Sequence, residues 1–265
     1  MQLNIYQTRN GNPRKATLVF VHGLFHGGWC WQKNFVPYFE KNGFNCVSID
    51  LRGHGKSEGI EQLKKYTLND YVDDIGSVIQ GVDGKIVLIG HSMGGALVER
   101  YVQKNRIDAA VLLTPPPLSG AMPAFNRLGK RVGRITLLKF ALFKDPFLVI
   151  QNPEASKLMF FTDQMSDEEY NKYFSQMGQE SYKVCMELTK PYIHSELNPF
   201  KVPILLVGAN QDGFFTHGET DEIGQKYGLI PVYFDGGHDL MLEKNWSKVA
   251  DGIYDWMVSQ GMTKT

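Results

Sequence analysis

Residues 86–97 read IVLIGHSMGGAL and combine the features of a strand, a tight turn and a helix. The apolar run at its start is typical of a buried strand, and the residues from Met93 onward predict a regular helix. Between strand and helix lies a Gly-x-Ser-x-Gly turn centred on Ser92. A serine on such a sharp turn has strained backbone angles, and side chains at positions 90 and 94 would collide, so both positions require glycine. The turn therefore projects the Ser92 hydroxyl beyond the end of the strand.

Apolar runs of the same kind recur along the chain and alternate with helical patterns. Short runs rich in β-branched residues favour strands, and strands separated by helices favour βαβ units. Residues 68–79 repeat apolar side chains at helical spacing and have aspartates on the polar side. The pattern predicts a parallel sheet that helices cover on both faces. The runs predicted as strands are residues 16–21, 44–49, 85–89, 109–113 and 203–207, with 3–7 and 232–234 at the two ends.

Length and composition favour one domain with an insertion. The chain has 265 residues, of which 43% are hydrophobic, enough to bury a full core. The formal net charge is zero, which predicts no global attraction to nucleic acid or to an acidic membrane. The three cysteines have no metal-ligand spacing, so they predict buried thiols in a reducing compartment and no metal site. Because no leader-like or membrane-spanning segment is recognisable, we expect a cytoplasmic protein without stable membrane insertion.

The strand–helix alternation stops between residues 115 and 200. This segment opens with three prolines, and Asn152 and Ser166 are predicted helix N-caps. We expect a core domain of residues 1–114 and 201–265, with residues 115–200 inserted as a helical cap over the carboxyl edge of the sheet. The cap is rich in large apolar residues, and five phenylalanines are candidates for substrate binding: Phe125, Phe143, Phe160, Phe161 and Phe174.

A small basic cluster lies within the same segment. Lys130, Arg131, Arg134 and Lys139 are close together in the sequence, and they could contact anionic lipid. Charged residues of a surface helix usually form its solvated face, so a solvated face is favoured over a lipid contact for this cluster.

In a parallel α/β sheet the functional crevice lies at the carboxyl ends of the strands. Ser92, Asp212 and His238 each follow a predicted strand, and they occur in the order Ser, Asp, His. Free serine is a poor nucleophile at neutral pH and needs a base, so His238 is the expected base. Asp212 would fix the tautomer of the ring and stabilise the imidazolium. The backbone N–H groups of Leu24 and Met93 would form an oxyanion hole.

Other titratable residues near the strand ends are expected to be structural. His22 is interpreted as a structural residue of the oxyanion loop, and His91 is expected to point away from the crevice. Asp50 also follows a strand, but the turn LRGHG comes directly after it, so a structural role in that turn is favoured over an acid role. His54 lies within that turn, and the remaining histidines have no strand-end context: His26, His194 and His217.

Together these motifs resemble the α/β-hydrolase superfamily, and in particular its serine esterases and lysophospholipase-like members. The resemblance extends from about residue 16 to the end of the chain and implies an eight-stranded, mostly parallel sheet, a cap inserted after the sixth strand, a Ser-Asp-His triad and no cofactor. Epoxide hydrolases and haloalkane dehalogenases of this fold use an aspartate nucleophile, and a serine stands at that position here. The motifs are HG at 22–23, DLRGHGKS at 50–57, GHSMGG at 90–95, Gly208 with Asp212, and Gly237 with His238.

One loop has a narrower resemblance. Residues 22–29, HGLFHGGW, look like the oxyanion loop of plant methylesterases and hydroxynitrile lyases. The small cap of those proteins and their lysine near the active site are not recognisable in this sequence. We therefore do not expect lyase activity.

The leading hypothesis is a serine hydrolase that cleaves carboxylic esters with an apolar acyl or alcohol group through an acyl-enzyme. Monoacylglycerols and lysophospholipids are examples of such esters. A thioesterase, a C–C bond hydrolase or a cofactor-free perhydrolase would use the same triad. A ligand receptor on the hydrolase scaffold is an alternative of a different class, and it would turn over chromogenic esters slowly or only once. We expect a small-molecule ester as partner, no nucleic acid, and a monomer or homodimer.

Overall fold

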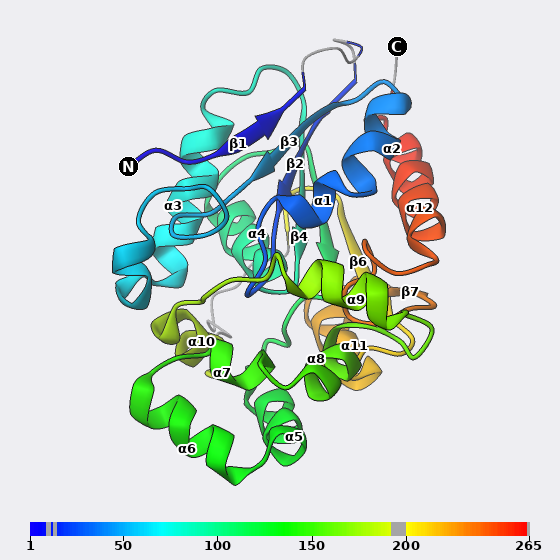
Figure 1. Ribbon diagram of the computed structural model, residues 1–265. Coiled ribbons are helices and arrows are strands. Elements are labelled where there is room, and N and C mark those ends of the chain that lie inside the picture. The colour runs from blue at the N-terminus through cyan, green and yellow to red at the C-terminus, as the bar shows by residue number, and fades with distance from the viewer. Residues whose placement is uncertain (9–11, 13–14, 192–199, 264–265) are drawn as a thin grey trace.

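The computed structural model describes residues 1–8, 12, 15–191 and 200–263, and its centre is a seven-stranded sheet (Figure 1). The strand order is β1-β3-β2-β4-β5-β6-β7. β1 pairs antiparallel with β3 at one edge, and every other neighbouring pair is parallel. The strands are β1 (Ile5–Gln7), β2 (Thr17–Val21), β3 (Asn45–Ile49), β4 (Ile86–His91), β5 (Ala109–Leu113), β6 (Ile204–Ala209) and β7 (Val232–Phe234).

The seven strands lie where the apolar runs predict them, and the α/β class is confirmed. The expectation of eight strands was too high, because the described part of the chain forms seven. The described residues before β2 form only the short β1, and its pairing with β3 already occupies that edge of the sheet. β2, β4, β5 and β6 are buried along their whole length, as expected for strands that helices cover on both faces.

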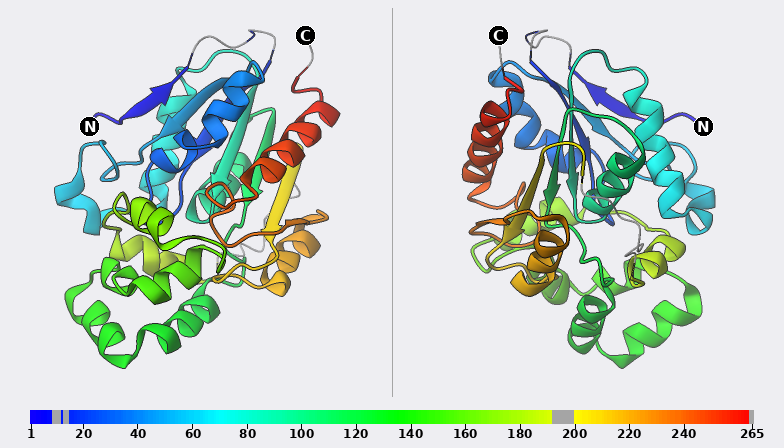
Figure 2. Two further views of the ribbon diagram at one scale, coloured as in Figure 1. Left: turned by 45° about the vertical axis from the view of Figure 1, so that its right-hand side comes forward. Right: turned by 180° about the vertical axis from the view of Figure 1, so that it is seen from behind.

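Helices cover both faces of the sheet (Figure 2). α1, α2 and α12 lie on one face, whereas α3 and α4 pack against each other on the opposite face. A capping box of Thr67 and Asp70 fixes the start of α3, where the apolar spacing predicts a helix. The helical elements outside the segment between β5 and β6 are α1 (Trp29–Gln32), α2 (Phe35–Lys41), η1 (Ile60–Lys65), α3 (Leu68–Ile79), α4 (Met93–Lys104), α11 (His217–Tyr227) and α12 (Trp246–Ser259).

Among the described residues, six further helices lie between β5 and β6 in the chain and group at one end of the molecule, away from both termini (Figures 1 and 2). The side chains of Asn152 and Ser166 accept hydrogen bonds at the starts of α8 and α9, as predicted. Residues 192–199, at the end of the predicted insertion, are outside the described residues. None of the described helices combines the length and apolarity needed to cross a bilayer. The six are α5 (Met122–Val132), α6 (Arg134–Phe143), α7 (Phe147–Ile150), α8 (Pro153–Phe160), α9 (Asp167–Phe174) and α10 (Tyr182–Leu188).

The aromatic core lies between the sheet and the helices α1 and α2. Trp31 and Phe39 pack on Phe20 of β2, with ring centroids 5.1 and 6.1 Å apart, and all three side chains are fully buried. Burying a side chain of this size contributes about 1.5–3 kcal/mol to stability. The packed layer gives the strand ends fixed positions from which functional side chains can project.

Candidate active site

Ser92 occupies a strained turn between β4 and α4. Its backbone angles are φ 51° and ψ −120°, a combination that residues with a Cβ rarely adopt. A Cβ at Gly90 would collide with the backbone of Gly94, and a Cβ at Gly94 would collide with the carbonyl of Val21. Both positions therefore require glycine. The Ser92 N–H donates to the Leu113 carbonyl over 2.9 Å, which ties the turn to the end of β5.

His238 and Asp212 form a buried pair after β7 and β6. Nδ1 of His238 lies 2.9 Å from Oδ2 and 3.1 Å from Oδ1 of Asp212. The N–H groups of Phe214 and Phe215 donate to Oδ1 over 2.7 and 2.9 Å, so the carboxylate is held in place. Because a carboxylate accepts, Nδ1 holds the proton and Nε2 is the basic nitrogen. Burial of the ring opposes protonation, but the Asp212 carboxylate raises the pKa of His238 above its usual value.

His91 links the turn at Ser92 to the segment that contains His238. Nε2 of His91 lies 3.1 Å from the His238 carbonyl, and the two rings are 4.9 Å apart. The Thr114 hydroxyl, at the end of β5, donates to the same carbonyl over 3.1 Å. Burial lowers the pKa of His91, and the nearby His238 adds to the effect, so this ring stays neutral. The structure thus brings the carboxyl ends of β4 and β5 close to the segment that follows β7.

Of the two predicted oxyanion donors, Met93 directly follows Ser92, and Leu24 follows a glycine that packs against this turn. Gly23 packs against it, because a Cβ at that position would be 3.0 Å from Cβ of Ser92, and Leu24 comes next in the chain. Met93 is the first residue of α4, so its N–H belongs to a helical turn whose amides have no intrahelical acceptor. The positive end of the helix dipole favours negative charge at this position.

Buried histidines hold the loop of residues 22–28 that contains Leu24. Nε2 of His22 accepts from the Leu51 N–H over 3.1 Å, and burial lowers the pKa of this ring. Nδ1 of His26 donates to the Leu24 carbonyl over 2.7 Å, and its Nε2 lies 3.0 Å from Oδ2 of Asp239. The side chains of His26 and Asp239 are both fully buried. Sequence patterns did not reveal this pair, and the one available signal was the position of Asp239 next to the predicted base.

Glu180, which precedes α10, is a second buried carboxylate that reaches the loop. Its Oε2 accepts from the Phe25 N–H over 3.3 Å and lies 3.0 Å from Nε2 of His54. Its Oε1 accepts from the Tyr71 hydroxyl over 3.2 Å. Burial opposes protonation of His54, but Glu180 raises the pKa of this ring above its usual value. A lone glutamate in a helical segment has no sequence signal for such a role, because its partners are more than a hundred residues away.

Asp50 binds its own turn and its neighbours. Oδ1 accepts from the Gly28 N–H over 2.6 Å, and Oδ2 accepts from the Lys56 N–H over 2.9 Å and from the Asn4 amide over 2.7 Å. Gly55 has φ +54°, and a Cβ there would collide with the Asp50 carboxylate, so the turn requires glycine at this position. This geometry matches the structural role expected for Asp50.

Aromatic rings surround His238. The rings of Phe214 and Phe215 lie 5.5 and 5.3 Å from it, and the ring of Phe160 lies 6.4 Å away. Phe125 packs on Phe214 at 5.7 Å, so it is one ring removed from the histidine. Phe214 and Phe215 were not singled out from the sequence, although they follow Asp212 in the same strand-end loop.

The other three predicted phenylalanines lie elsewhere. Phe161 is 2% exposed and stacks on Tyr173, and Phe174 stacks on Tyr170. Phe143 is on α6 with 58% of its surface exposed. The structure therefore brings two of the five predicted residues, Phe160 and Phe125, towards His238.

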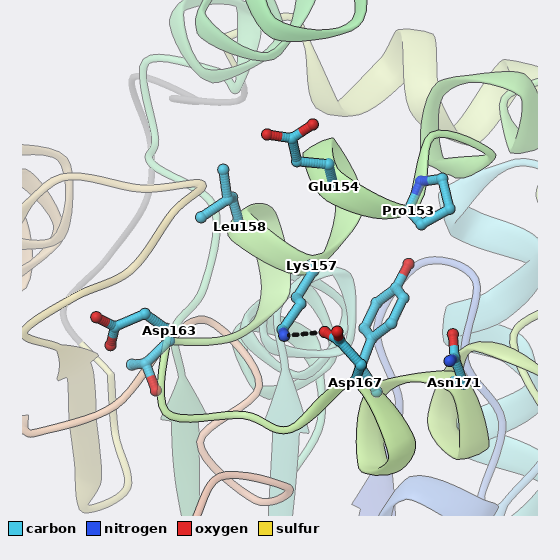
Figure 3. A pocket seen from close by; sticks show the side chains of 9 residues that line it. Pro153, Glu154, Lys157, Leu158, Asp163, Asp167 and Asn171 are labelled. Atoms are coloured by element: carbon cyan, nitrogen blue, oxygen red, sulfur yellow. Dashed lines mark hydrogen bonds and ion pairs between the residues drawn. The ribbon is translucent and has the colours of Figure 1, made fainter.

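Two of the cavities along the helical segment differ in their lining. The larger, about 550 Å³, lies between α8 and α9, and none of its lining residues is a predicted site residue (Figure 3). Its Lys157 and Asp167 pair with each other at 2.5 Å. The smaller, about 160 Å³, is lined mainly by apolar residues of α5, α6, α7 and α10, including Phe125. Among the described residues, no group of three histidine, cysteine or acidic side chains could hold a metal ion.

The chain is similar in sequence to known proteins. A family model described as Alpha/beta hydrolase family matches residues 18–251. Methylesterase 9 from Arabidopsis thaliana is 36% identical over 123 residues, which are 44% of this chain and 47% of the relative. AB hydrolase superfamily protein YisY from Bacillus subtilis is 27% identical over 244 residues, 86% of each chain. The matches span 32–47% of the length of the first three curated relatives.

Solved structures share the fold over nearly the whole chain. A monoacylglycerol lipase from Paleococcus ferrophilus has a TM-score of 0.74 and 22% sequence identity. The superposition covers 98% of this chain and 100% of that chain. At this level of identity the similarity concerns the fold alone.

Proposed function

This chain belongs to the α/β-hydrolase family, and we propose that it is a serine hydrolase that cleaves carboxylic esters with an apolar acyl or alcohol group. The observation that most directly supports the proposal is the buried His238–Asp212 pair at the sheet edge where the strained turn presents Ser92. Nucleophilic serine chemistry needs a base that is oriented by a third group, and this pair supplies both. The names of relatives such as Methylesterase 9 agree with an ester substrate.

In the proposed reaction, Oγ of Ser92 attacks the ester carbonyl while Nε2 of His238 takes its proton. The tetrahedral oxyanion binds the N–H groups of Leu24 and Met93, each of which would contribute about 3–4 kcal/mol to transition-state stabilisation. The protonated His238 then gives its proton to the departing alcohol, which leaves an acyl-enzyme. Water, deprotonated by the same ring, attacks the acyl carbonyl, and the bond to Oγ of Ser92 breaks. The carboxylic acid leaves, and His238 returns the proton to Oγ.

We further propose that residues 115–200 act as a cap over a core of residues 1–114 and 201–265. Phe160 of this segment and Phe214 of the core pack around His238, and Phe125 extends the apolar surface from Phe214 to the cavity of about 160 Å³. Apolar rings on this side of the base favour an apolar acyl or alcohol group over a charged one, because a charge would lose its hydration there.

Covalent labelling of the purified chain tests the nucleophile. A fluorophosphonate is expected to add one label, and Ser92→Ala should lose both the label and turnover of p-nitrophenyl esters. Ser119→Ala, at an exposed serine bound to Glu222, is the matched control and should keep both. Turnover that persists in Ser92→Ala would contradict the proposed triad.

A panel of substrates distinguishes an esterase from a thioesterase and from a ligand receptor. Acyl thioesters and p-nitrophenyl esters of increasing chain length should be tested with one enzyme preparation. Repeated turnover with a preference for apolar acyl esters is the expected result. Single turnover, with tight retention of the ligand, would instead indicate a receptor on the hydrolase scaffold.

A further inference from the structure

The helix α6 has an unusual surface. None of its residues is buried, although most of its side chains are apolar. Five large apolar residues of this helix have 38–74% of their surface exposed: Ile135, Leu137, Leu138, Leu142 and Phe143. A helix that is apolar around its circumference is normally buried in protein or lipid, and a contiguous apolar surface usually marks an interaction site.

Charges of one sign accompany these side chains. Residues 109–144 contain six basic residues and no acidic residue, whereas the formal net charge of the whole chain is zero. Arg127 is paired with Glu219 at 2.6 Å. The other five are exposed, and in the part of the chain that the structure describes none has a carboxylate within ion-pair distance: Lys130, Arg131, Arg134, Lys139 and Lys144. We call these five cations and the five apolar residues the α6 face.

The apolar surface continues into the protein. Leu137 is part of the α6 face and also lines the cavity of about 160 Å³, together with Phe140. Met122, which is 43% exposed, lines the same cavity from α5. The cavity wall and the outer surface are thus formed by the same helices. Figures 1 and 2 show α5 and α6 at the end of the molecule opposite the two termini.

We propose that the α6 face docks the protein peripherally on an anionic lipid surface. Exposed leucine, isoleucine and phenylalanine side chains would enter the interface, and the surrounding cations would bind lipid phosphates. A second copy of the chain is a poor occupant, because pairing two such faces would bring ten uncompensated cations together. Nucleic acid would satisfy the cations but would leave the apolar side chains without a partner.

Vesicle sedimentation of the purified full chain tests this proposal independently of catalysis. The protein is expected to sediment with vesicles of phosphatidylcholine mixed with phosphatidylglycerol, and not with phosphatidylcholine alone. Rising salt should release it, because salt screens the basic residues. A basic residue near an anionic surface contributes about 1 kcal/mol, or about fivefold in affinity, so Lys130→Gln with Arg131→Gln should weaken binding by about 25-fold. Leu138→Ser with Leu142→Ser should weaken it by at least about tenfold.

Matched controls lie away from the α6 face. Ile230→Ser removes an apolar side chain that is 88% exposed, and Lys104→Gln with Arg106→Gln removes two exposed cations at the far end of α4. Both controls should bind the mixed vesicles like the original chain, and circular dichroism should show the same fold in every variant. Failure of the original chain to sediment, or equal binding by the α6 and control variants, would overturn the proposal. So would self-association without vesicles that Leu138→Ser with Leu142→Ser abolishes.

Discussion

Asp212 and Asp50 both follow strands but bind different partners. Asp212 faces Nδ1 of His238 and also accepts from two backbone N–H groups, whereas Asp50 accepts from the amide groups of its own turn and its neighbours. Both positions follow a strand, so strand-end placement alone does not separate them. The partner atoms assign Asp212 to the ring and Asp50 to the turn.

Asp212→Asn is expected to keep the fold and lower kcat by about 10⁴, because an amide no longer selects the tautomer with a basic Nε2. Asp50→Asn is the matched control and should mainly lower the melting temperature, because its carboxylate holds backbone amides. Ester kinetics and thermal melts of both variants check the difference. The opposite pattern, with the large kinetic loss in Asp50→Asn at an unchanged melting temperature, would reverse the assignment.

The pH dependence follows from the raised pKa of His238. Only the neutral ring can accept the serine proton, so kcat/KM should rise with pH through a midpoint above the usual histidine value of 6.5. In Asp212→Asn the carboxylate that raises this pKa is absent and burial remains, so the midpoint of the residual activity should move to lower pH. Profiles of kcat/KM for both proteins provide the measurement. A midpoint that stays in place would mean that another group limits the rate.

Among the secondary-structure elements, two carboxylates of the helical segment are hydrogen-bonded to the core, one buried and one half-buried. Glu180 accepts from the Phe25 N–H in the loop that contains Leu24. Glu187 accepts from the Leu68 N–H at the start of α3 over 2.8 Å. The two glutamates come from the same segment, but only the first reaches the loop beside Ser92. They therefore offer a comparison between positioning the site and stabilising the fold.

Glu180→Gln is expected to lower kcat by about ten- to a hundredfold with little change in KM, because a looser loop misplaces the Leu24 donor. Each buried donor that loses its acceptor costs about 1–3 kcal/mol, so the melting temperature should fall as well. Glu187→Gln should lower the melting temperature and leave kcat nearly unchanged. If both variants lose stability and neither changes kcat, Glu180 is a structural residue only.

Three phenylalanines of the helical segment should respond differently to alanine. Phe161→Ala, at 2% exposure, should cost about 3–5 kcal/mol of folding free energy, and Phe143→Ala, at 58% exposure, within about 0.5 kcal/mol. Phe125→Ala should change the preference between acyl chains by about 1–3 kcal/mol, because this ring lies between Phe214 and the cavity. Urea midpoints and chain-length profiles provide the two readouts. An unchanged profile for Phe125→Ala would move the acyl pocket elsewhere.

In the whole molecule, buried contacts connect the helical segment to the core that contains the sheet. Phe160 packs on His26 and His238, and the Thr162 N–H donates to Glu243 over 2.6 Å. Together with Glu180, these contacts join the segment to the loops at several strand ends. We therefore expect the segment and the core to unfold together.

Urea unfolding can test this coupling, because all four tryptophans lie outside residues 115–200. Tryptophan fluorescence therefore reports on α1 and α12, whereas far-ultraviolet circular dichroism also reports on the six helices of the segment. The two transitions should coincide if the molecule unfolds in one step. A dichroism transition that begins at lower urea would show that the segment unfolds separately.

Local sequence patterns were enough to predict the strands, the positions of α3, α8 and α9, and the turn at Ser92. These features depend on interactions between residues a few positions apart: apolar periodicity, helix capping and the glycines that the turn requires. Because each of Ser92, Asp212 and His238 follows a predicted strand, the sequence also indicated these three residues as candidates for one site. The family resemblance added an eighth strand, which the described chain does not form.

Only the tertiary structure decided which side chains meet across long stretches of sequence. His26 and Asp239 are 213 residues apart, and Glu180 is 155 residues from Phe25, yet both pairs fix the loop beside Ser92. Whether an apolar residue packs inward or remains exposed is decided in the same way. Phe161, which directly follows α8, and Phe143, at the end of α6, come from the same apolar segment and differ because they meet different neighbours. The burial of a large apolar side chain in this segment depends on which elements pack against it, so the local sequence does not separate Phe161 from Phe143.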